Sequence, residues 1–592
     1  MAAPRIIVVG GGLAGLAAVI KIAEAGGTVD LFSIVPVKRS HSVCAQGGIN
    51  AAKNLKGEGD TTAQHFDDTI YGGDFLANQT PVKAMCEAAP GIVDLLDRMG
   101  VPFNRTPEGL LDFRRFGGTL YHRTAFAGAT TGQQLLYALD EQVRRYEAEG
   151  KVHKYEGWEF LSAVIDSQGA SRGIVALDLR SMELKAFAAD AIILATGGIG
   201  AIFGKSTNSV VCTGSAQSAV FQQGAYYANG EFIQVHPTAI PGEDKLRLMS
   251  ESARGEGGRM WVPRTPGDKR AWKAIPESER LYFLEEWYPK YGNLVPRDVA
   301  TRAIHKVVYE LGLGIGGQPM VYLDLTHIDR ETLHRKLGGI LEIYEKFVGV
   351  DPCVEPMMIF PGMHYTMGGL WVDFNQMTNI PGIFACGECE YQYHGANRLG
   401  ANSLVSCIFG GFQAGPNALA YAKSAAAAEG DGGAAAEVAR QAEINGKLIR
   451  NEGGENPFKL WRELGLAMTE HATVIRYSKD LKETDEKIVE LLDRYQRVNL
   501  SDKSQWANTS FAFARQLKNM LELSRTVVGG AILRDESRGA HYKPDFPERN
   551  DERFLKTTLA SFTGCVEGPR FEYEEVDTQY IKPRPRRYDA VK

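Results

Sequence analysis

The chain has 592 residues, 44% of them hydrophobic, so it can bury several cores, and its length suggests about four domains. Its 66 Lys and Arg against 72 Asp and Glu give a net charge of −6 without a basic stripe, which argues against nucleic acid as the main partner. Eight cysteines show no disulfide-framework spacing and are expected to be free thiols in a reducing compartment. No segment is long enough to span a bilayer, so we expect the chain itself to be soluble.

The N-terminal sequence predicts a strand, a tight turn and a helix. Residues 5–9 are an apolar run of strand character, and residues 13–21 carry small and apolar side chains at helical spacing. The glycines between them permit the turn, the approach of backbone to a pyrophosphate and close packing of helix on strand. A ligand-free glycine-rich loop is the weaker alternative, because strand and helix flank the motif. The expected nucleotide contacts are Gly10, Gly12, Leu13, Ala14 and Gly15.

The next expected strand, residues 28–32, departs from the usual dinucleotide pattern. An acidic residue normally follows this strand and binds a ribose hydroxyl, but Ser33 stands there. Asp30 lies inside the strand rather than at its end. We therefore expect Ser33 to make the ribose contact.

Two mid-chain segments indicate that the chain returns to the same sheet. Residues 190–198 and 382–388 are apolar strands that each run into a glycine turn, on either side of residues 238–353. This predicts a discontinuous cofactor domain with a second domain inserted, and a substrate crevice between the two. The expected class is α/β: a Rossmann-like dinucleotide-binding domain with an inserted α+β domain, then a helical domain and a small C-terminal domain.

Low-complexity sequence at residues 424–436 marks a boundary before a helical region. One apolar helix face is expected at Ile488, Leu491, Leu492 and Tyr495, and another at Phe513, Leu517, Met520 and Leu521. The predicted ranges are 1–237 and 354–424 for the dinucleotide-binding domain, 238–353 for the inserted domain, 437–540 for the helical domain and 541–592 for the C-terminal domain.

Eight motifs carry a resemblance to a known family. They are RSHSVCAQGG, ATGG, HPT, SESARGEGG, PRDVATR, HYTMGG, HGANRLGANSL and RDESRGAHY. Their order resembles that of the flavoprotein subunit of succinate dehydrogenase and quinol:fumarate reductase, over nearly the whole chain. HGANRLGANSL and ESRGAHY are also similar to segments of L-aspartate oxidase, whereas the RSH segment distinguishes the respiratory enzymes.

The resemblance implies that the cofactor domain is an FAD-binding domain, that the inserted domain is a capping domain, and that the FAD is covalently bound. In the respiratory family the histidine of the RSH segment bonds to the 8α-methyl group of the flavin, and that position is His41 here. By the same analogy the link raises the flavin potential enough for succinate to reduce it. Thr213-Gly214-Ser215-Ala216 departs from the Thr-Gly-Asp-Gly of many relatives, which leaves the FAD contacts of that loop open. The other cofactor-binding residues implied are Ser40, Ser42, Gln46, Gly47, Gly48, Ala195, Thr196, Gly197, Glu388, Ser403 and Leu404.

The substrate implied is a four-carbon dicarboxylate, whose two anionic ends each need cationic or hydrogen-bonding partners. His364 and Arg398 resemble the clamp for one carboxylate. His236 with Ser250 resembles the other, with Ser250 where better-known members have Thr. Phe116 resembles the aromatic residue that presses on the substrate, and ordinary core packing is its competing interpretation.

The resemblance also implies the proton carrier. Arg297 is similar to the acid/base arginine of the family, with Glu251 and Arg254 as a relay to solvent. A guanidinium normally stays protonated, so the role fits best in fumarate reduction, where Arg297 only donates.

The electrons must leave through a partner. Cys386-x-x-Cys389 is the one close cysteine pair; two thiols cannot hold an iron-sulfur cluster, so both are read as structural and no metal site is expected. The resemblance implies a separate iron-sulfur subunit, a haem-containing cytochrome b membrane anchor, and a peripheral place on the cytoplasmic face of the cell membrane. We expect the basic segment 581–587 to be a solvated terminus.

Two alternatives stay open at this point. One is a soluble enzyme such as L-aspartate oxidase or a free fumarate reductase, and the other is a dinucleotide-binding scaffold without turnover. His41, His236, His364, Arg297 and Arg398 together argue against the scaffold, because folding alone requires no such set.

Overall fold

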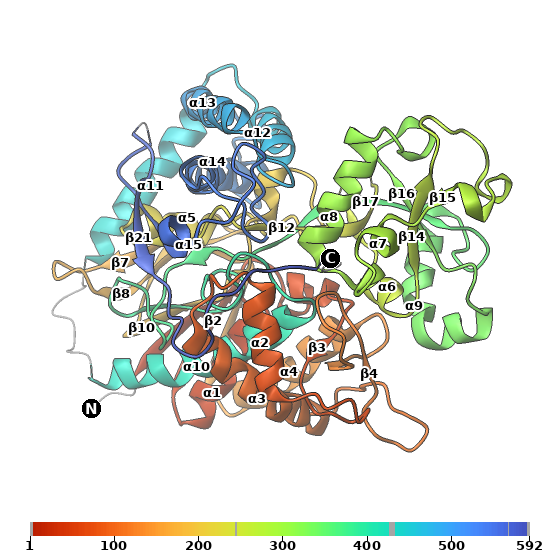
Figure 1. The fold of residues 1–592 in the computed structure, drawn as a ribbon. Coiled ribbons are helices and arrows are strands. Elements are labelled where there is room, and N and C mark those ends of the chain that lie inside the picture. The colour runs from red at the N-terminus through yellow and green to blue at the C-terminus, as the bar shows by residue number, and fades with distance from the viewer. Residues whose placement is uncertain (1–3, 243–244, 425–432, 566, 589–592) are drawn as a thin grey trace.

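The computed structural model describes residues 4–242, 245–424, 433–565 and 567–588 (Figure 1). At its centre is a five-stranded sheet whose pairings are all parallel. In sheet order the strands are β19 (Ile383–Ala385), β10 (Ala191–Leu194), β1 (Arg5–Val9), β2 (Thr28–Ser33) and β6 (Val152–Glu156). Distant parts of the sequence thus meet in one sheet, which confirms the predicted doubly wound α/β fold.

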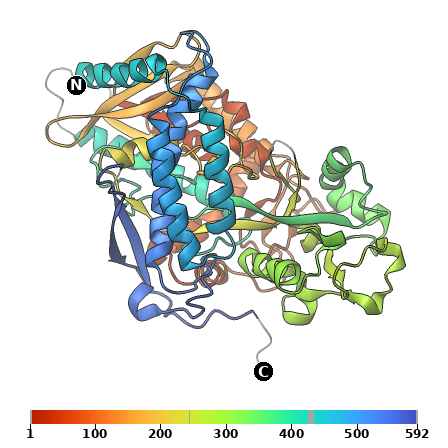
Figure 2. The ribbon, with the colours of Figure 1, turned by 90° about the horizontal axis from the view of Figure 1, so that it is seen from above.

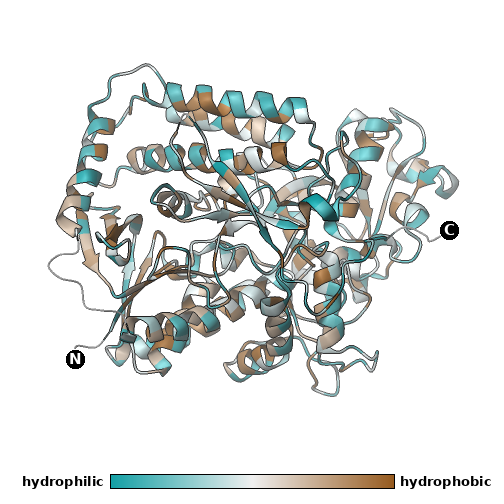
Figure 3. Cartoon of the chain, turned by 60° about the vertical axis from the view of Figure 1, so that its left-hand side comes forward, coloured by the Kyte–Doolittle hydropathy of each residue, from teal (hydrophilic) through white to brown (hydrophobic). Residues whose placement is uncertain are grey.

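The central strands are buried on both faces because their residues are apolar throughout. In β1, Ile6 and Val8 belong to one core, while Ile7 and Val9 belong to the core on the opposite face. The first core is closed by α1 (Leu13–Glu24), α3 (Gln79–Arg98), α4 (Thr131–Ala148) and α10 (Asn402–Ser424). Figure 3 shows the apolar residues gathered on these inner strands and on the inward helix faces.

The inserted segment forms a lobe beside the sheet domain, on the right in Figure 1. Its antiparallel sheet has the order β13 (Arg247–Leu248), β12 (Ile233–Ile240), β17 (Met357–Thr366), β16 (Val321–Asp324), β14 (Arg259–Pro263) and β15 (Arg280–Leu281). Its helices are α6 (Ser252–Gly255), α7 (Phe283–Trp287), α8 (Arg297–His305) and α9 (Arg330–Val348). The long strands β12 and β17 connect this lobe to the central domain, and we call the lobe the capping domain.

Four helices follow the second half of the sheet domain: α11 (Ala434–Arg450), α12 (Pro457–His471), α13 (Ser478–Tyr495) and α14 (Thr509–Leu533). Figure 2 shows α12, α13 and α14 side by side. Both predicted apolar faces are turned inward, with Ile488, Leu491, Leu517 and Met520 buried. Of the low-complexity boundary, residues 425–432 lie outside the described residues. The alanines after it already belong to α11, as their high helix propensity favours.

Smaller elements complete the chain. The remaining strands are β3 (Ile49–Asn50), β4 (Phe113–Arg114), β5 (Thr124–Ala125), β7 (Trp158–Ile165), β8 (Ser171–Asp178), β9 (Leu184–Ala188), β11 (Tyr227–Ala228), β18 (Gly369–Leu370), β20 (Lys556–Ser561) and β21 (Arg570–Glu575). The remaining helices are α2 (Thr62–Gly72), α5 (Ser215–Gln222) and α15 (Asp551–Phe554). Among the described residues, no helix combines the length and apolar character that a membrane crossing requires.

The C-terminal segment corrects one expectation. The basic segment was expected to be solvated, and Lys582, Arg584 and Arg587 are exposed, but the Arg586 side chain has an exposure of 6% and donates to both carboxylate oxygens of Asp298, at 2.7 and 2.9 Å. Tyr588 is buried, with its ring 5.0 Å from that of Tyr291 and 5.5 Å from that of Tyr71. A run of basic residues looked solvated because its acidic and aromatic partners are distant in sequence. Arg586, near the end of the described residues, therefore binds α8 of the capping domain.

Candidate active site

A cavity of about 480 Å³ lies between the carboxyl ends of the central strands and the capping domain. Of the site residues predicted from sequence, all line this cavity except Gly15 and Arg254. Gly15 holds α1 close to the turn, since a Cβ there would run into the backbone of Gly10. Arg254 lies behind Glu251, to which its Nη2 donates at 2.8 Å. The fold thus gathers residues from widely separated regions of the sequence at one place.

One end of the cavity is built for a dinucleotide. Gly10 has φ +116°, and a Cβ there would lie 2.6 Å from the carbonyl carbon of Ala195. Gly12 precedes α1 without a capping side chain of its own, so the first turn of the helix offers backbone amides to a ligand. Ser42 Oγ accepts from Leu13 N at 3.2 Å and ties the RSH segment to this turn. The residues present therefore fit the pyrophosphate of FAD.

Two polar residues flank the dinucleotide end. Ser33 is the last residue of β2, as expected, and its Oγ donates to the carbonyl of Val35 at 2.6 Å, which leaves its lone pairs for a ligand. Glu388 accepts from Thr366 N at 3.1 Å, and burial raises the pKa of its carboxyl to about 7. Ser403 and Leu404 begin α10, with their backbone at the positive end of that helix.

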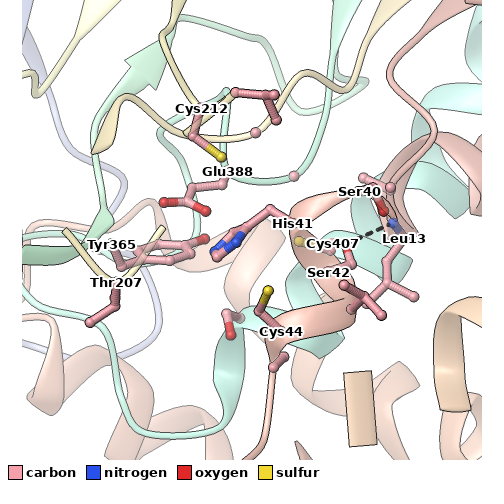
Figure 4. A pocket seen from close by; sticks show the side chains of 18 of the residues that line it. Leu13, Ser40, His41, Ser42, Cys44, Thr207, Cys212, Tyr365, Glu388 and Cys407 are labelled. Carbon is pink, nitrogen blue, oxygen red and sulfur yellow. Dashed lines mark hydrogen bonds between the residues drawn. The ribbon is translucent and has the colours of Figure 1, made fainter. Parts of the chain in front are cut away.

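His41 stands in a short 3-10 turn, His41–Cys44, and its ring points into the cavity beside Glu388 and Tyr365 (Figure 4). Its Nδ1 accepts from Ser209 N at 3.2 Å, and its Nε2 lies 3.1 Å from Asn208 Nδ2. Burial, followed by the charge of Lys245, lowers the pKa of His41 to about 4. The ring is therefore neutral at physiological pH, the form in which an imidazole nitrogen is nucleophilic.

Two further histidines face each other at the other end of the cavity. The ring centroids of His236 and His364 are 5.0 Å apart. Burial, and next the positive charge of Arg297, lower the pKa of both rings well below the ordinary value. Because Thr238 N donates to His236 Nδ1 at 3.2 Å, the hydrogen of the neutral ring lies on Nε2, which has no protein partner. This N–H is free to donate to a carboxylate.

Arg398 supplies a buried cation between these histidines and the flavin-binding region. Its guanidinium lies 4.3 Å from the ring centroid of Tyr365, and its Nε has no partner among the described residues. Burial and the nearby charge of Arg297 lower its pKa to about 9. An uncompensated buried cation is costly, so this site favours an anion.

A second arginine is held by a carboxylate. Arg297 is the first residue of α8, and its Nε and Nη2 donate to Glu251 Oε2 at 2.9 and 2.8 Å. Burial alone would raise the pKa of Glu251, but the charges of Arg297 and Arg254 together lower it. Glu251 Oε1 also accepts from Gly117 N at 3.1 Å. Arg297, Glu251 and Arg254 thus form a continuous hydrogen-bonded row.

The loops over the flavin region meet both domains. Gln46 Nε2 donates to Leu248 O of the capping domain at 3.0 Å. A Cβ on Gly47 would lie 2.9 Å from the ring of Phe116, so the aromatic side chain covers the Gly47-Gly48 backbone. Ser250 is buried with its Oγ 2.9 Å from Ser252 Oγ.

Sequence reasoning missed several residues that the structure brings to this site. Gln234 accepts from Arg297 Nη1 at 2.9 Å and donates to the carbonyl of Arg398 at 2.8 Å, so it fixes the spacing of the two arginines. Tyr365 supports Arg398, and Thr207 and Asn208 contact His364 and His41. Gln234 lies two residues before HPT and Tyr365 lies inside HYTMGG, whereas Thr207 and Asn208 lie in no quoted motif and gave no signal.

The cysteine pair is structural in its contacts. Cys389 Sγ donates to Leu194 O at 3.1 Å and to Cys386 O at 3.2 Å, and all eight cysteines are free. The described residues contain no group of three or more His, Cys, Asp or Glu side chains placed to hold a metal ion.

Glu390, next to this pair, gives a stability prediction. Burial raises its pKa to about 8, so the folded protein binds a proton that the unfolded chain releases near 4.5. Stability is therefore expected to fall as pH rises from about 4.5 to about 8, by up to about 1.4 kcal/mol per pH unit from this group. Glu390→Gln should raise Tm at pH 8.5 and leave it unchanged at pH 5. Glu470→Gln, on the surface of α12, is the control and should leave Tm unchanged at both pH values. Equal Tm values for Glu390→Gln and wild type at pH 8.5 would refute this.

The dinucleotide fold and a cavity that ends among arginines and neutral histidines define an FAD-dependent oxidoreductase. Residues 5–404 match the FAD binding domain family, and residues 461–588 match the family described as fumarate reductase flavoprotein C-term. The chain is 62% identical to the succinate dehydrogenase flavoprotein subunit of Bacillus subtilis over 100% of both chains. It is 35% identical to the fumarate reductase flavoprotein subunit of Escherichia coli, covering 98% of this chain and 95% of that one.

Solved structures agree. A variant of E. coli quinol fumarate reductase superposes with a TM-score of 0.90 at 33% identity, covering 99% of each chain. The chain belongs to the family of succinate dehydrogenase and fumarate reductase flavoprotein subunits. The fold class and the family expected from the motifs are thereby confirmed.

Proposed function

We propose that this chain is the catalytic flavoprotein of a membrane-associated succinate:quinone oxidoreductase and interconverts succinate and fumarate. The observation that carries the proposal is the end of the cavity, where two neutral histidines and an anion-seeking Arg398 surround a space beside Arg297. A molecule with one carboxylate at each end satisfies both groups of donors at once. The whole-length similarity to a succinate dehydrogenase subunit supports this choice over L-aspartate oxidase.

Each residue has a distinct part in the proposed reaction. His364 and Arg398 bind one carboxylate, and His236 with Ser250 binds the other. Phe116 lies over Gly47 and presses the substrate toward the flavin. FAD, when bound, accepts or supplies the hydride. Arg297 donates the proton to the substrate carbon in fumarate reduction and is reprotonated through Glu251, whose other oxygen is bonded to Arg254.

The finer features of the cofactor and the partners are part of the same proposal. His41 would hold FAD through a bond from its ring to the 8α carbon, for which the ring and the 8α-methyl group each lose one hydrogen and the flavin takes up the two electrons; its neutral ring in the cavity supports this role. Electrons leave to an iron-sulfur subunit and then, through a cytochrome b membrane anchor, to quinone. The chain is held on the cytoplasmic face of the membrane by these partners.

His41→Ser tests the covalent link. Wild type, unfolded in detergent after full cofactor loading, should show a flavin-fluorescent band under ultraviolet light, and His41→Ser should show none while still binding FAD when folded. Because an imidazole on the 8α carbon withdraws electrons, the variant should have a lower flavin potential and lose succinate oxidation more than fumarate reduction. A wild-type band without fluorescence would refute the link. Succinate-dependent dye reduction by the loaded wild-type protein tests the reaction itself.

A further inference from the structure

Three consecutive residues, Thr207, Asn208 and Ser209, hold two histidines from distant parts of the chain. Thr207 Oγ1 lies 2.7 Å from Nδ1 of His364, and Asn208 Nδ2 donates to the carbonyl of His364 at 2.8 Å. The same Asn208 Nδ2 lies 3.1 Å from Nε2 of His41, and Ser209 N donates to His41 Nδ1 at 3.2 Å. The segment therefore touches the proposed flavin attachment site on one side and the proposed substrate site on the other. Figure 4 shows Thr207 and His41 lining the same pocket.

The segment is itself fixed in place. Asn208 is 2% exposed, and its backbone N–H donates to Ser206 Oγ at 3.2 Å. Lys245 Nζ, from the capping domain, donates to the Asn208 carbonyl at 3.1 Å. The Asn208 side chain lies over Gly200, where a Cβ would come within 2.7 Å of the Asn208 Cβ. A segment held at its backbone and its side chain can impose a position on the rings it contacts.

The contact to Ser209 selects one nitrogen of His41. A backbone N–H can only donate, so Nδ1 must carry the lone pair of the ring. In the neutral ring the hydrogen then lies on Nε2, so the Asn208 amide, itself a donor, contacts Nε2 without a hydrogen bond. Asn208 acts instead through the backbone, because its Nδ2 donates to the His364 carbonyl and holds the segment that carries the Ser209 N–H. Nε2 is the nitrogen left to bond to carbon once it has lost its hydrogen, and substitution there keeps the Ser209 hydrogen bond intact. Burial and the charge of Lys245 hold the ring neutral, and His364 is the other titratable group that interacts with it electrostatically.

Thr207 has the corresponding effect on His364. Its hydroxyl is hydrogen-bonded to Nδ1, and its backbone N–H donates to the carbonyl of Met363 at 3.0 Å. These two bonds fix both the ring and the strand that carries it. For Nε2 of the neutral ring to donate to a substrate carboxylate, Nδ1 must accept, so in that state the Thr207 hydroxyl donates to Nδ1 rather than to the Met363 carbonyl 3.3 Å away.

We propose that residues 207–209 form one positioning element, in which Asn208 and Ser209 orient His41 for attachment to the flavin while Thr207 orients His364 for the substrate carboxylate. The inference rests on the proposed function and deepens it. None of the three side chains has to contact the substrate or the flavin for this role, so all three are positioning residues. The cofactor link and the dicarboxylate pocket are then built on a single stretch of backbone.

Single variants of the full chain, produced with its partner subunits, test the two halves separately. Asn208→Leu removes the amide at similar size and should lower the covalent flavin fraction below about a tenth of wild type, while FAD still binds to the folded protein. Asn208→Ser, whose side chain is too short to reach His41, should lower the covalent flavin fraction in the same way and serves as the test if Asn208→Leu does not fold. Thr207→Val should raise KM for succinate about tenfold with kcat within about twofold, because one hydrogen bond to the binding histidine is lost. Thr207→Ser, which keeps the hydroxyl, should restore KM.

Val210→Ala is the matched control, since Val210 follows the segment and is 69% exposed. The measurements are flavin fluorescence of the unfolded band, total flavin absorbance of the native protein, and steady-state kinetics with a dye acceptor. Full covalent flavin in both Asn208 variants, or an unchanged KM in Thr207→Val, would overturn the corresponding half of the inference while leaving the proposed function standing. Absence of covalent flavin in wild type would instead remove the proposed link and the Asn208 assignment together.

Discussion

Arg297→Gln is expected to lower kcat for both succinate oxidation and fumarate reduction by about 10²–10⁴-fold, the contribution that a positioned proton donor makes. The variant should still carry covalent flavin, because Arg297 lies on the substrate side of the cavity and makes no contact with His41. KM should change much less than kcat, since Arg398 and the two histidines hold the carboxylates. Steady-state kinetics in both directions, together with the fluorescence of the unfolded band, measure these effects.

Arg297→Lys should behave similarly although it keeps the charge. Arg297 donates to Glu251 through Nε and Nη2 and to Gln234 through Nη1 at the same time. A lysine ammonium is a single point of charge and cannot reproduce this planar arrangement. Arg330→Gln, on the surface of α9 with a side-chain exposure of 61%, is the matched control and should keep wild-type kinetics. More than about a tenth of wild-type kcat in Arg297→Gln would remove this residue from the proton path.

Arg398→Gln should raise KM for both dicarboxylates by about 30-fold or more, since truncating one partner of a buried charge pair costs about 2–5 kcal/mol. The substrate-free protein should be no less stable than wild type, because Arg398 has no acidic hydrogen-bond partner and its removal also removes the cost of a buried cation. Tm measured with and without a saturating dicarboxylate separates the two effects. Wild type should be stabilised by the ligand and the variant should not.

The pH dependence gives an independent check on Arg398. Burial and Arg297 lower its pKa to about 9, and a neutral guanidine does not attract a carboxylate. The wild-type KM is therefore expected to rise as pH increases beyond about 9, while the KM of Arg398→Gln stays flat over that range. A wild-type KM that is constant from pH 8 to pH 10 would contradict this.

The sequence predicted the elements that local patterns encode. The apolar run at residues 5–9, the glycine turn and the helix after it are found as β1 and α1, and Ser33 ends β2. The motif glycines were informative because each is needed for a positive φ or a close backbone approach, which depends on few neighbours. The sites of His236, His364, Arg297 and Arg398 on one cavity followed from the family resemblance rather than from local pattern.

Other contacts could not be predicted because both partners are ordinary residues far apart in sequence. Nothing in the sequence marks Gln234 as a site residue, because only the folded β12 places it between Arg297 and the Arg398 backbone. Asn208 and His41 are 167 positions apart, and only the folded chain brings them to 3.1 Å. The basic terminal segment was misjudged for the same reason, because its Asp298 partner is 288 residues away.

That terminal segment has a consequence for how the enzyme is made. Asp298 directly follows Arg297 in α8, and its carboxylate is held by Arg302 and by Arg586. During translation, residues 297 and 298 emerge from the ribosome long before residue 586 does, so the Asp298 carboxylate lacks one of its two arginines until residue 586 has been synthesised. Proteolytic clipping near residue 580 would leave this carboxylate buried with only one arginine, directly beside the arginine that we propose as the proton donor.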